Sequence, residues 1–253
     1  FDAMNAGAVD FVAKPAVSER RQLESFIRNE LLVKIKIAST AKISRIKQQV
    51  MAQEPEKFTA HEKNLVIAIG ASTGGTEAIF AVMKDYGADL PGIVVVQHMP
   101  PGFTEMYAKR LDNQCRVRVK EARTGDRVLP GTVLIAPGGD KHMHLVKVNG
   151  MYQVEVKAGP KVNGHCPSVD VLFESVAKVA GPNALGIILT GMGGDGAKGL
   201  LAMRKAGART IGQDESTCVV YGMPKVAYDL GAVEFQEKLS NIAKKTYYVL
   251  NTM

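Results

Sequence analysis

The segment LVIAIGASTGG, residues 65–75, runs from five apolar residues directly into a turn rich in glycine. A short apolar run of this kind is typical of a strand buried on both faces of a sheet. Residues 74–86 follow with the pattern of an amphipathic helix. The segment therefore predicts a strand, a tight turn and a helix in succession, and a chain that repeats this order builds a parallel sheet covered by helices.

The same alternation continues to the C-terminus. We expect further strands at residues 92–97, 116–122, 133–136, 185–189 and 210–212, and helices at 103–113, 169–179, 196–206, 225–230 and 240–250. Asn149-Gly150 separates two strand-like segments, residues 145–148 and 152–156, and predicts a hairpin with a type I′ turn. We therefore predict an α/β fold: a doubly wound, mainly parallel sheet with helices on both faces and an antiparallel β-hairpin at one edge.

The first 63 residues have a different pattern. Residues 9–12 predict a short strand, and residues 18–32 predict a polar helix. Residues 34–63 carry mixed charge with little apolar periodicity, as linkers do. We therefore divide the chain into residues 1–32, an interdomain linker at 33–63 and a main domain at 64–253.

The composition excludes several classes of protein. Of the 253 residues, 46% are hydrophobic and 23% are charged, which is typical of a globular protein and not of a disordered or fibrous one. No apolar run approaches the roughly 20 residues of a membrane-spanning helix, and we see no secretory signal, so we expect no membrane insertion. The three cysteines show no C-x-x-C spacing, and we expect a cytoplasmic protein.

The net charge of +7 is spread along the chain. No dense basic cluster and no aromatic signature of RNA binding accompany the 32 Lys and Arg residues. We therefore expect no nucleic-acid partner.

Ser72 stands in the pattern G-x-S-x-G, between a predicted strand and a predicted helix. At that place it lies at the mouth of the sheet, where helix N–H groups could stabilise an oxyanion. A phosphate cradle uses the same geometry, so a nucleophile and a phosphate site are equally supported by this motif. The absence of G-K-[ST] and of G-x-G-x-x-G argues against a P-loop and a dinucleotide fold.

Two further polar residues follow predicted strands. His98 ends the strand at 92–97, and sequential strands are usually neighbours, so its imidazole could take a proton from Ser72. Asp195 follows the strand at 185–189 and could orient His98, or it could simply cap its own helix. The order Ser, His, Asp differs from the Ser, Asp, His order of the α/β-hydrolases.

Residues 64–250 closely resemble the catalytic domain of the CheB family of chemotaxis methylesterases. The resemblance rests on residues 69–75, 97–104, 136–139, 165–173 and 189–196, which occur in the order of that family. It implies Ser72 as nucleophile, His98 as general base and Asp195 as the residue that orients it. It also implies Thr73, Gly74 and Met192 as oxyanion- or substrate-binding residues, with the Met192 N–H in the oxyanion hole.

The resemblance implies that the protein hydrolyses glutamate γ-methyl esters on the cytoplasmic helical region of chemoreceptors and releases methanol. Deamidation of receptor glutamines is also expected, as part of chemotaxis adaptation. This chemistry needs no cofactor. No metal site is expected, because His142 and His144 are interpreted as solvated loop residues. The alternatives are a non-enzymatic nucleotide- or phosphate-binding protein and a pure interaction module.

Residues 6–15 resemble the end of a two-component receiver domain, so residues 1–32 are interpreted as its last strand and helix. The phospho-accepting Asp would lie upstream of Phe1, and no phosphorylation site is expected within the chain. An upstream histidine kinase is expected as a partner only if the full receiver is present. Cys166 stands where the family often has Arg, and this difference affects a local contact rather than the three catalytic residues.

Overall fold

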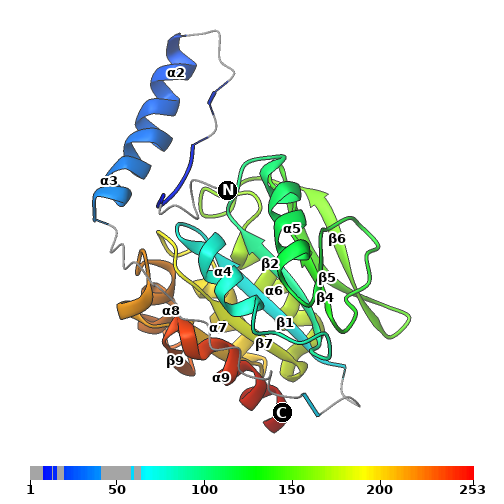
Figure 1. Cartoon of the computed structure of the whole chain (residues 1–253). Coiled ribbons are helices and arrows are strands. Elements are labelled where there is room, and N and C mark those ends of the chain that lie inside the picture. Colours follow the sequence, from blue (N-terminus) through cyan, green and yellow to red (C-terminus); the bar gives the residue numbers. More distant parts are fainter. Residues whose placement is uncertain (1–7, 13, 16–19, 41–57, 60–63) are drawn as a thin grey trace. The chain divides into compact units, whose positions relative to one another are not determined.

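The computed structural model describes residues 8–12, 14–15, 20–40, 58–59 and 64–253 (Figure 1). The chain forms two compact units, residues 1–50 and 51–253, which are described separately below. None of the described helices is long and apolar enough to span a membrane.

The first unit contains one continuous helical stretch. It consists of α2 (Arg20–Phe26), a π-helical turn η1 (Ile27–Leu31) and α3 (Leu32–Thr40). The predicted end near residue 32 was wrong, because no Gly or Pro interrupts residues 16–54 and the helix continues. The strand predicted at residues 9–12 is not formed, since no described segment pairs with it. The division at residues 32 and 63 stays a prediction, and most of residues 41–63 lie outside the described residues.

The second unit is built on a sheet of seven parallel strands in the order β3-β4-β2-β1-β7-β8-β9. The strands are β1 (Val66–Ala71), β2 (Gly92–Gln97), β3 (Arg118–Glu121), β4 (Thr132–Ile135), β7 (Ala184–Ile188), β8 (Arg209–Gln213) and β9 (Phe235–Glu237). Every residue of β1, β2 and β7 is buried, as the apolar runs predicted. Only the three-residue edge strand β9 was not expected.

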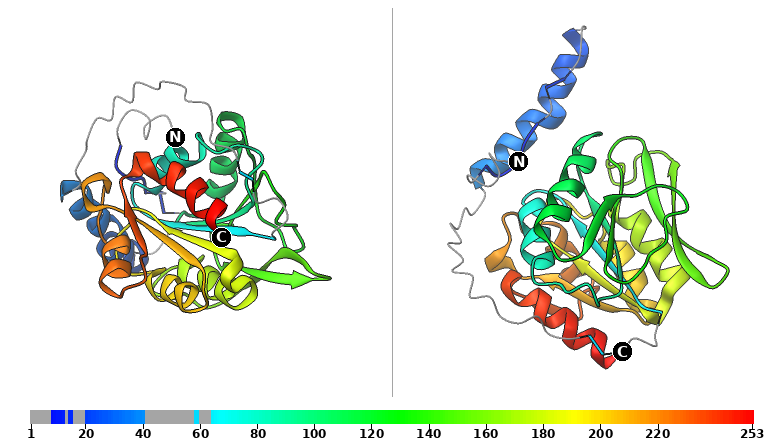
Figure 2. Two further views of the ribbon diagram at one scale, coloured as in Figure 1. Left: turned by 90° about the horizontal axis from the view of Figure 1, so that it is seen from below. Right: turned by 45° about the vertical axis from the view of Figure 1, so that its right-hand side comes forward.

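Helices cover both faces of this sheet, and Figure 2 shows the sheet between two helical layers. One layer contains α4 (Gly75–Met83), α5 (Phe103–Gln114) and α9 (Leu239–Thr252), and the other contains α6 (Val169–Ala180), α7 (Ala197–Lys205) and α8 (Met223–Asp229). The predicted α/β fold is confirmed.

The predicted hairpin is also confirmed, with β5 (Lys141–Val148) paired antiparallel to β6 (Met151–Ala158). Asn149 and Gly150 have φ values of 49° and 82°, as a type I′ turn requires. The hairpin forms a separate two-stranded sheet that packs against α6, instead of extending the large sheet. Its buried side chains, including Met143 and Tyr152, join the core on that side.

The strand order locates the crevice of the sheet. From the central strand β1 the chain moves to β2 on one side and returns later as β7 on the other. Ligands of open α/β sheets bind beyond the carboxyl ends of the strands at such a reversal.

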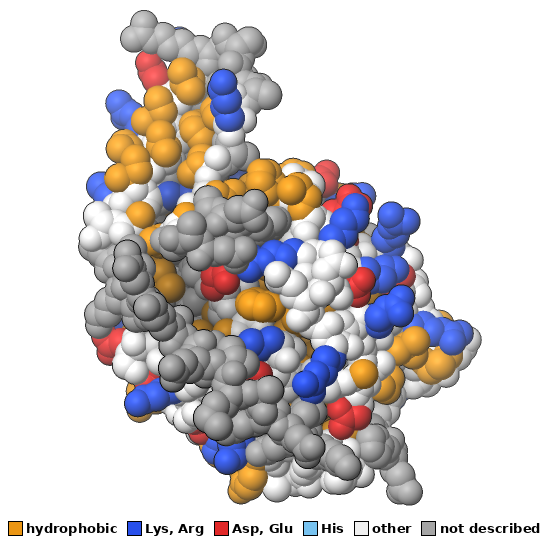
Figure 3. Space-filling model, viewed as in Figure 1, with side chains coloured by type: hydrophobic (Ala, Val, Ile, Leu, Met, Phe, Trp, Pro, Cys, Tyr) orange, Lys and Arg blue, Asp and Glu red, His pale blue; other side chains and the backbone are white. Residues whose placement is uncertain are grey.

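On the face seen in Figure 3, Lys and Arg side chains lie interspersed with Asp and Glu.

Candidate active site

Ser72 is the first residue after β1, and its backbone is held on both sides. Its N–H donates to the carbonyl of Thr190 at 3.0 Å, and its own carbonyl accepts from the N–H of Gly75 at 2.7 Å. The residue is half-buried. The turn therefore fixes the serine at the mouth of the sheet, as the motif predicted.

The two residues after Ser72 have structural contacts of their own. Thr73 is buried, and its carbonyl accepts from Thr190 Oγ1 at 3.0 Å. Gly74 is the N-cap of α4 with φ 77°, and a Cβ added there would lie 2.6 Å from Cβ of Val219. Both the backbone conformation and the close approach of Val219 require glycine at this position.

His98 lies directly beside the Ser72 turn. Ala71 pairs with Gln97 in the sheet, and the N–H of His98 donates to the carbonyl of Ala71 at 3.1 Å. The expected neighbourhood of Ser72 and His98 is therefore present. The side chain of His98 is 8% exposed, and its Nε2 lies 2.8 Å from Oδ2 of Asp195.

The second ring nitrogen of His98 is buried and has no hydrogen-bond partner among the described residues. A carboxylate only accepts hydrogen bonds, so the contact with Asp195 places the imidazole proton on Nε2. Nδ1 of the neutral ring then carries the free lone pair. The geometry therefore makes Nδ1 the nitrogen that can take a proton.

The carboxylate of Asp195 is fully buried and accepts five hydrogen bonds. The donors are Asn163 Nδ2 (2.8 Å), Ser168 Oγ (2.7 Å) and Asp170 N (3.2 Å) to Oδ1, and His98 Nε2 (2.8 Å) and Val169 N (2.7 Å) to Oδ2. Burial raises the pKa of Asp195. The hydrogen bond and charge of His98, together with the hydrogen bonds from Asn163 and Ser168, outweigh the effect of burial and hold the pKa well below its usual range. Asp195 is therefore an ionised carboxylate.

Asp195 does not cap its own helix. The N-cap of α7 is Gly196, with φ 90°, whereas the carboxylate of Asp195 lies at the N-terminus of α6 and accepts from Val169 and Asp170 there. The positive end of the α6 dipole stabilises the negative charge. The alternative interpretation of Asp195 as the cap of its own helix was therefore wrong.

Met192 lies in the glycine-rich loop after β7. Met192 is 44% exposed, and its backbone N–H has no acceptor within the described part of the chain. The preceding residue, Gly191, lies against Ser72, because an added Cβ would be 2.8 Å from Cβ of Ser72. An N–H at this place is available to an oxyanion formed at Ser72.

The residues of the site that the sequence analysis missed include His165, Asn163 and Gln97. The ring of His165 stacks on that of His98, with centroids 3.8 Å apart and planes 11° apart. Asn163 donates to Asp195, as described above. Gln97 donates from Nε2 to the carbonyls of Ser72 (2.9 Å) and His98 (3.2 Å), and so joins the two segments that carry these residues. The dipeptide Asn163-Gly164 was an available signal, since it has the same turn chemistry as Asn149-Gly150.

The expectation that His142 is a solvated loop residue is wrong. His142 is buried on β5, where Nε2 donates to the carbonyl of Pro160 at 2.9 Å and Nδ1 accepts from the N–H of Ser168 at 3.1 Å. His144 is half-buried on the same strand. Both were interpreted as solvated loop residues because the start of β5 was placed too late. Among the described residues no three His, Cys, Asp or Glu side chains gather into a metal-binding group.

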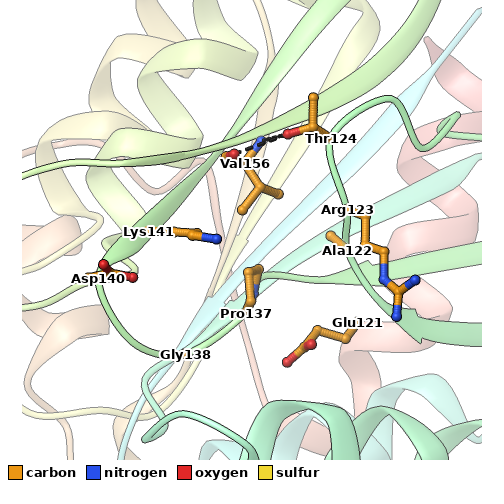
Figure 4. Close-up of a pocket in the computed structure, with 9 residues that line it drawn as sticks. All are labelled: Glu121, Ala122, Arg123, Thr124, Pro137, Gly138, Asp140, Lys141 and Val156. Carbon is orange, nitrogen blue, oxygen red and sulfur yellow. Dashed lines mark hydrogen bonds between the residues drawn. The ribbon is translucent and has the colours of Figure 1, made fainter.

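A separate pocket of about 340 Å³ lies beyond the ends of β3 and β4 (Figure 4). Glu121, Arg123, Asp140 and Lys141 supply its charged lining, and none of Ser72, His98 and Asp195 lines it. Glu121 accepts a hydrogen bond from Thr104 Oγ1, which in turn accepts from the N–H of Gly138 at 3.0 Å. The pocket is thus tied to α5, the helix that follows His98.

Comparisons with known proteins identify the family of the chain. The family model described as CheB methylesterase matches residues 67–246. A protein of Syntrophomonas wolfei named protein-glutamate methylesterase/protein-glutamine glutaminase 2 is 59% identical over 253 residues, which are 100% of this chain and 73% of the relative. A protein-glutamate methylesterase/protein-glutamine glutaminase of Salmonella typhimurium is 47% identical over 244 residues, covering 96% of this chain and 69% of the relative.

A solved structure shows the same likeness. The crystal structure of the Thermotoga maritima CheB methylesterase catalytic domain matches with a TM-score of 0.72 and 38% sequence identity, and the match covers 74% of this chain and 99% of that one.

Proposed function

The chain belongs to the CheB methylesterase family, and from this we propose that it is a serine hydrolase that cleaves glutamate γ-methyl esters on chemoreceptors. The products are methanol and a glutamate carboxylate. The relatives' names also include protein-glutamine glutaminase, and deamidation of receptor glutamines is the second reaction of the same site.

One observation carries the assignment of roles. The buried His98–Asp195 pair has 2.8 Å between Nε2 and Oδ2, and its two residues follow β2 and β7, the strands on either side of β1, which ends just before Ser72. These three residues have the chemistry of a nucleophile, a general base and an orienting carboxylate. In the proposed mechanism Ser72 Oγ attacks the ester carbonyl and its proton passes to His98 Nδ1. Asp195 then stabilises the imidazolium through Nε2–H.

The remaining steps follow from the same groups. The tetrahedral oxyanion accepts hydrogen bonds from backbone N–H groups around Thr73, Gly74 and Met192. The Nδ1–H of His98 protonates the departing methoxide, and methanol leaves. Water, deprotonated by His98, hydrolyses the acyl-Ser72 ester and restores the serine. A glutamine side chain reacts in the same way with ammonia as the leaving group.

The alternative function, non-enzymatic binding of a nucleotide or phosphate, is not favoured. It assigns no role to the buried lone pair of His98 Nδ1, and the relatives carry the names of hydrolases. The partners we propose are chemoreceptor proteins. A histidine kinase would act only on a protein that contains the complete receiver domain.

The test is methanol release from a methylated chemoreceptor cytoplasmic fragment. We expect Ser72→Ala to lose nearly all turnover, because the members of such a triad act as a unit. Ser240→Ala, on the exposed start of α9, is the control and keeps normal turnover. Turnover by Ser72→Ala at the rate of the parent protein would contradict the assignment of the nucleophile.

A further inference from the structure

Residues 162–165 form a tight turn next to the His98–Asp195 pair. The N–H of Val162 donates to the carbonyl of His165 at 3.0 Å, and the N–H of His165 donates to the carbonyl of Val162 at 2.9 Å. The two residues between them, Asn163 and Gly164, have φ values of 52° and 82°. Reciprocal hydrogen bonds and two positive φ values define a type I′ turn, for which Asn-Gly is the preferred sequence.

The first side chain of this turn holds the carboxylate. Asn163 Nδ2 donates to Asp195 Oδ1 at 2.8 Å and to Asp170 Oδ2 at 2.7 Å. Because both acceptors are carboxylates, the amide nitrogen must face them, which fixes the orientation of the side chain. Asp170 is itself held by the N–H of Gly199 at 2.7 Å. Asn163 therefore connects Asp195 to a second anchored carboxylate on α6.

The last side chain of the turn holds the imidazole. His165 covers one face of the His98 ring with its planes nearly parallel, while Asp195 binds the ring edge at Nε2. Burial, and after it the neighbouring His98, lower the pKa of His165 to about 4. His165 is therefore neutral near pH 7 and adds no positive charge beside His98.

We propose that the turn at residues 162–165 is a positioning element for the catalytic pair, with Asn163 fixing the carboxylate of Asp195 and His165 fixing the ring plane of His98. This inference rests on the proposed function. We assign neither residue a step of bond formation or proton transfer, and both act through their neighbours. One rigid turn supplies both contacts, and this links the position of the Asp195 carboxylate to that of the His98 ring.

The reason for such an element lies in the reaction. His98 gains and loses a proton at Nδ1 in each half-reaction, and its Nε2 must keep the contact with Asp195 throughout. A small misplacement of such a ring is costly, up to about 100-fold in rate. The charged or titratable groups around the pair are Asp170 and Glu174 on α6, Lys161 beside the turn, His165 within it, and Lys198 on α7.

Three variants test the proposal by kcat, KM and the pH profile of methanol release. Asn163→Gly removes the amide but keeps the backbone free to adopt positive φ. We expect a fall in kcat of roughly 10- to 100-fold with KM unchanged. His165→Ala is expected to lower kcat about 10-fold, and His165→Phe, which keeps a flat ring on His98, restores most of this loss.

The acid limb of the pH profile separates positioning from general damage. In Asn163→Gly the carboxylate loses a donor, and in His165→Ala water reaches the ring, so both changes favour the imidazolium and move the acid limb to higher pH. Asn149→Gly, in the matched Asn-Gly turn of the hairpin with φ 49° and 82°, keeps the kcat and profile of the parent protein. Unchanged kcat and profile in both Asn163→Gly and His165→Ala would overturn the proposal.

A second measurement makes the outcome independent of turnover. Nitrogen NMR of the imidazole of His98 follows its titration in each folded variant, whether or not the protein is active. If the parent protein releases no Ser72-dependent methanol, the proposed function fails, and the titration of His98 still decides the positioning role. An equal titration in the parent protein and in both turn variants would refute that role.

Discussion

The backbone N–H of Val169 donates a 2.7 Å hydrogen bond to Oδ2 of Asp195, the oxygen that also accepts from His98. Val169 is the first residue of α6, so the negative charge beside the proposed base His98 lies at the positive end of a helix. Ser168, the N-cap of that helix, donates to the other oxygen. One carboxylate thus binds both the His98 ring and the N-terminus of α6.

Replacement of Asp195 by Asn is expected to lower kcat by roughly 10³- to 10⁴-fold. The amide nitrogen must face at least one of the present donors, because every donor points at a carboxylate oxygen, and the imidazole loses its preferred tautomer. We also expect a lower free energy of unfolding in urea, since the N-terminus of α6 loses an acceptor. Kinetics of methanol release and urea titration measure the two effects.

Asp112→Asn is the matched control for this change. Asp112 accepts from the N–H of Val119 at 2.7 Å on the C-terminal half of α5, away from the strand ends that carry the site. It is expected to keep normal kcat. A kcat for Asp195→Asn within about tenfold of the parent protein would contradict the role of Asp195 as the residue that orients His98.

The sequence predicts the sheet and the place of Ser72 and His98 because both follow from local patterns. Apolar runs define the strands, and neighbouring strands bring their carboxyl ends together. The partners of Asp195 could not be found in this way, since Ser168 and Val169 are 27 and 26 residues away in sequence and meet it only in the packed structure. The strand pattern alone places Asp195 at the same edge of the sheet as Ser72 and His98, but it does not predict the hydrogen-bond partners of Asp195.

Other differences have equally local causes. The helix that ends at Thr40 continues past the predicted end because no residue stops it. His142 was placed in a loop because residues 141–144, Lys-His-Met-His, show no apolar alternation, although β5 starts at Lys141. A short pattern of this kind predicts that a strand exists better than it predicts where the strand begins.

Gln97→Glu is expected to disturb both segments that meet at Ser72. The Nε2 of Gln97 donates to the carbonyls of Ser72 and His98, and a carboxylate at this place would turn an oxygen toward two carbonyl oxygens. Because Gln97 is 3% exposed, water does not relieve the repulsion. We expect a loss of about 1–3 kcal/mol in the free energy of unfolding and a lower kcat.

Thermal and urea unfolding with parallel assays of methanol release measure the effects of Gln97→Glu. Gln114→Glu, at the exposed end of α5, keeps the acceptor that binds Nε of Arg110 and serves as the control. Equal stability and equal kcat in the two variants would show that Gln97 does not join the Ser72 and His98 segments.

Alanine in place of Gly74 and of Gly102 should have different effects, although both glycines are N-caps with similar φ values of 77° and 81°. At Gly102 an added Cβ meets no atom within 4 Å, so only the left-handed backbone costs free energy, roughly 1–2 kcal/mol. At Gly74 the added Cβ would also lie 2.6 Å from Cβ of Val219. Overpacking of this kind adds about 1–3 kcal/mol.

Urea unfolding of the two glycine variants compares these costs directly. The Gly74→Ala variant is also expected to lose activity, because the turn that carries Ser72 must shift to relieve the contact with Val219. Gly102→Ala lies at the start of α5 and keeps most of its turnover. A smaller loss of stability in Gly74→Ala than in Gly102→Ala would refute the steric argument.

The stability of the protein should fall between pH 6.5 and about 4, in part through His165. The pKa of His165 is lowered to about 4 in the folded protein, first by burial, whereas an unfolded histidine titrates near 6.5. Between these values the unfolded chain binds more protons than the folded one, so the free energy of unfolding rises with pH. The contribution is complete above pH 6.5 and is lost as the pH falls through this range.

The variant His165→Phe has no group that titrates at this position. Its free energy of unfolding should therefore decrease less than that of the parent protein when urea titrations at pH 7 and pH 5 are compared. An equal decrease in both proteins would show that His165 is as easily protonated in the folded state as in the unfolded one.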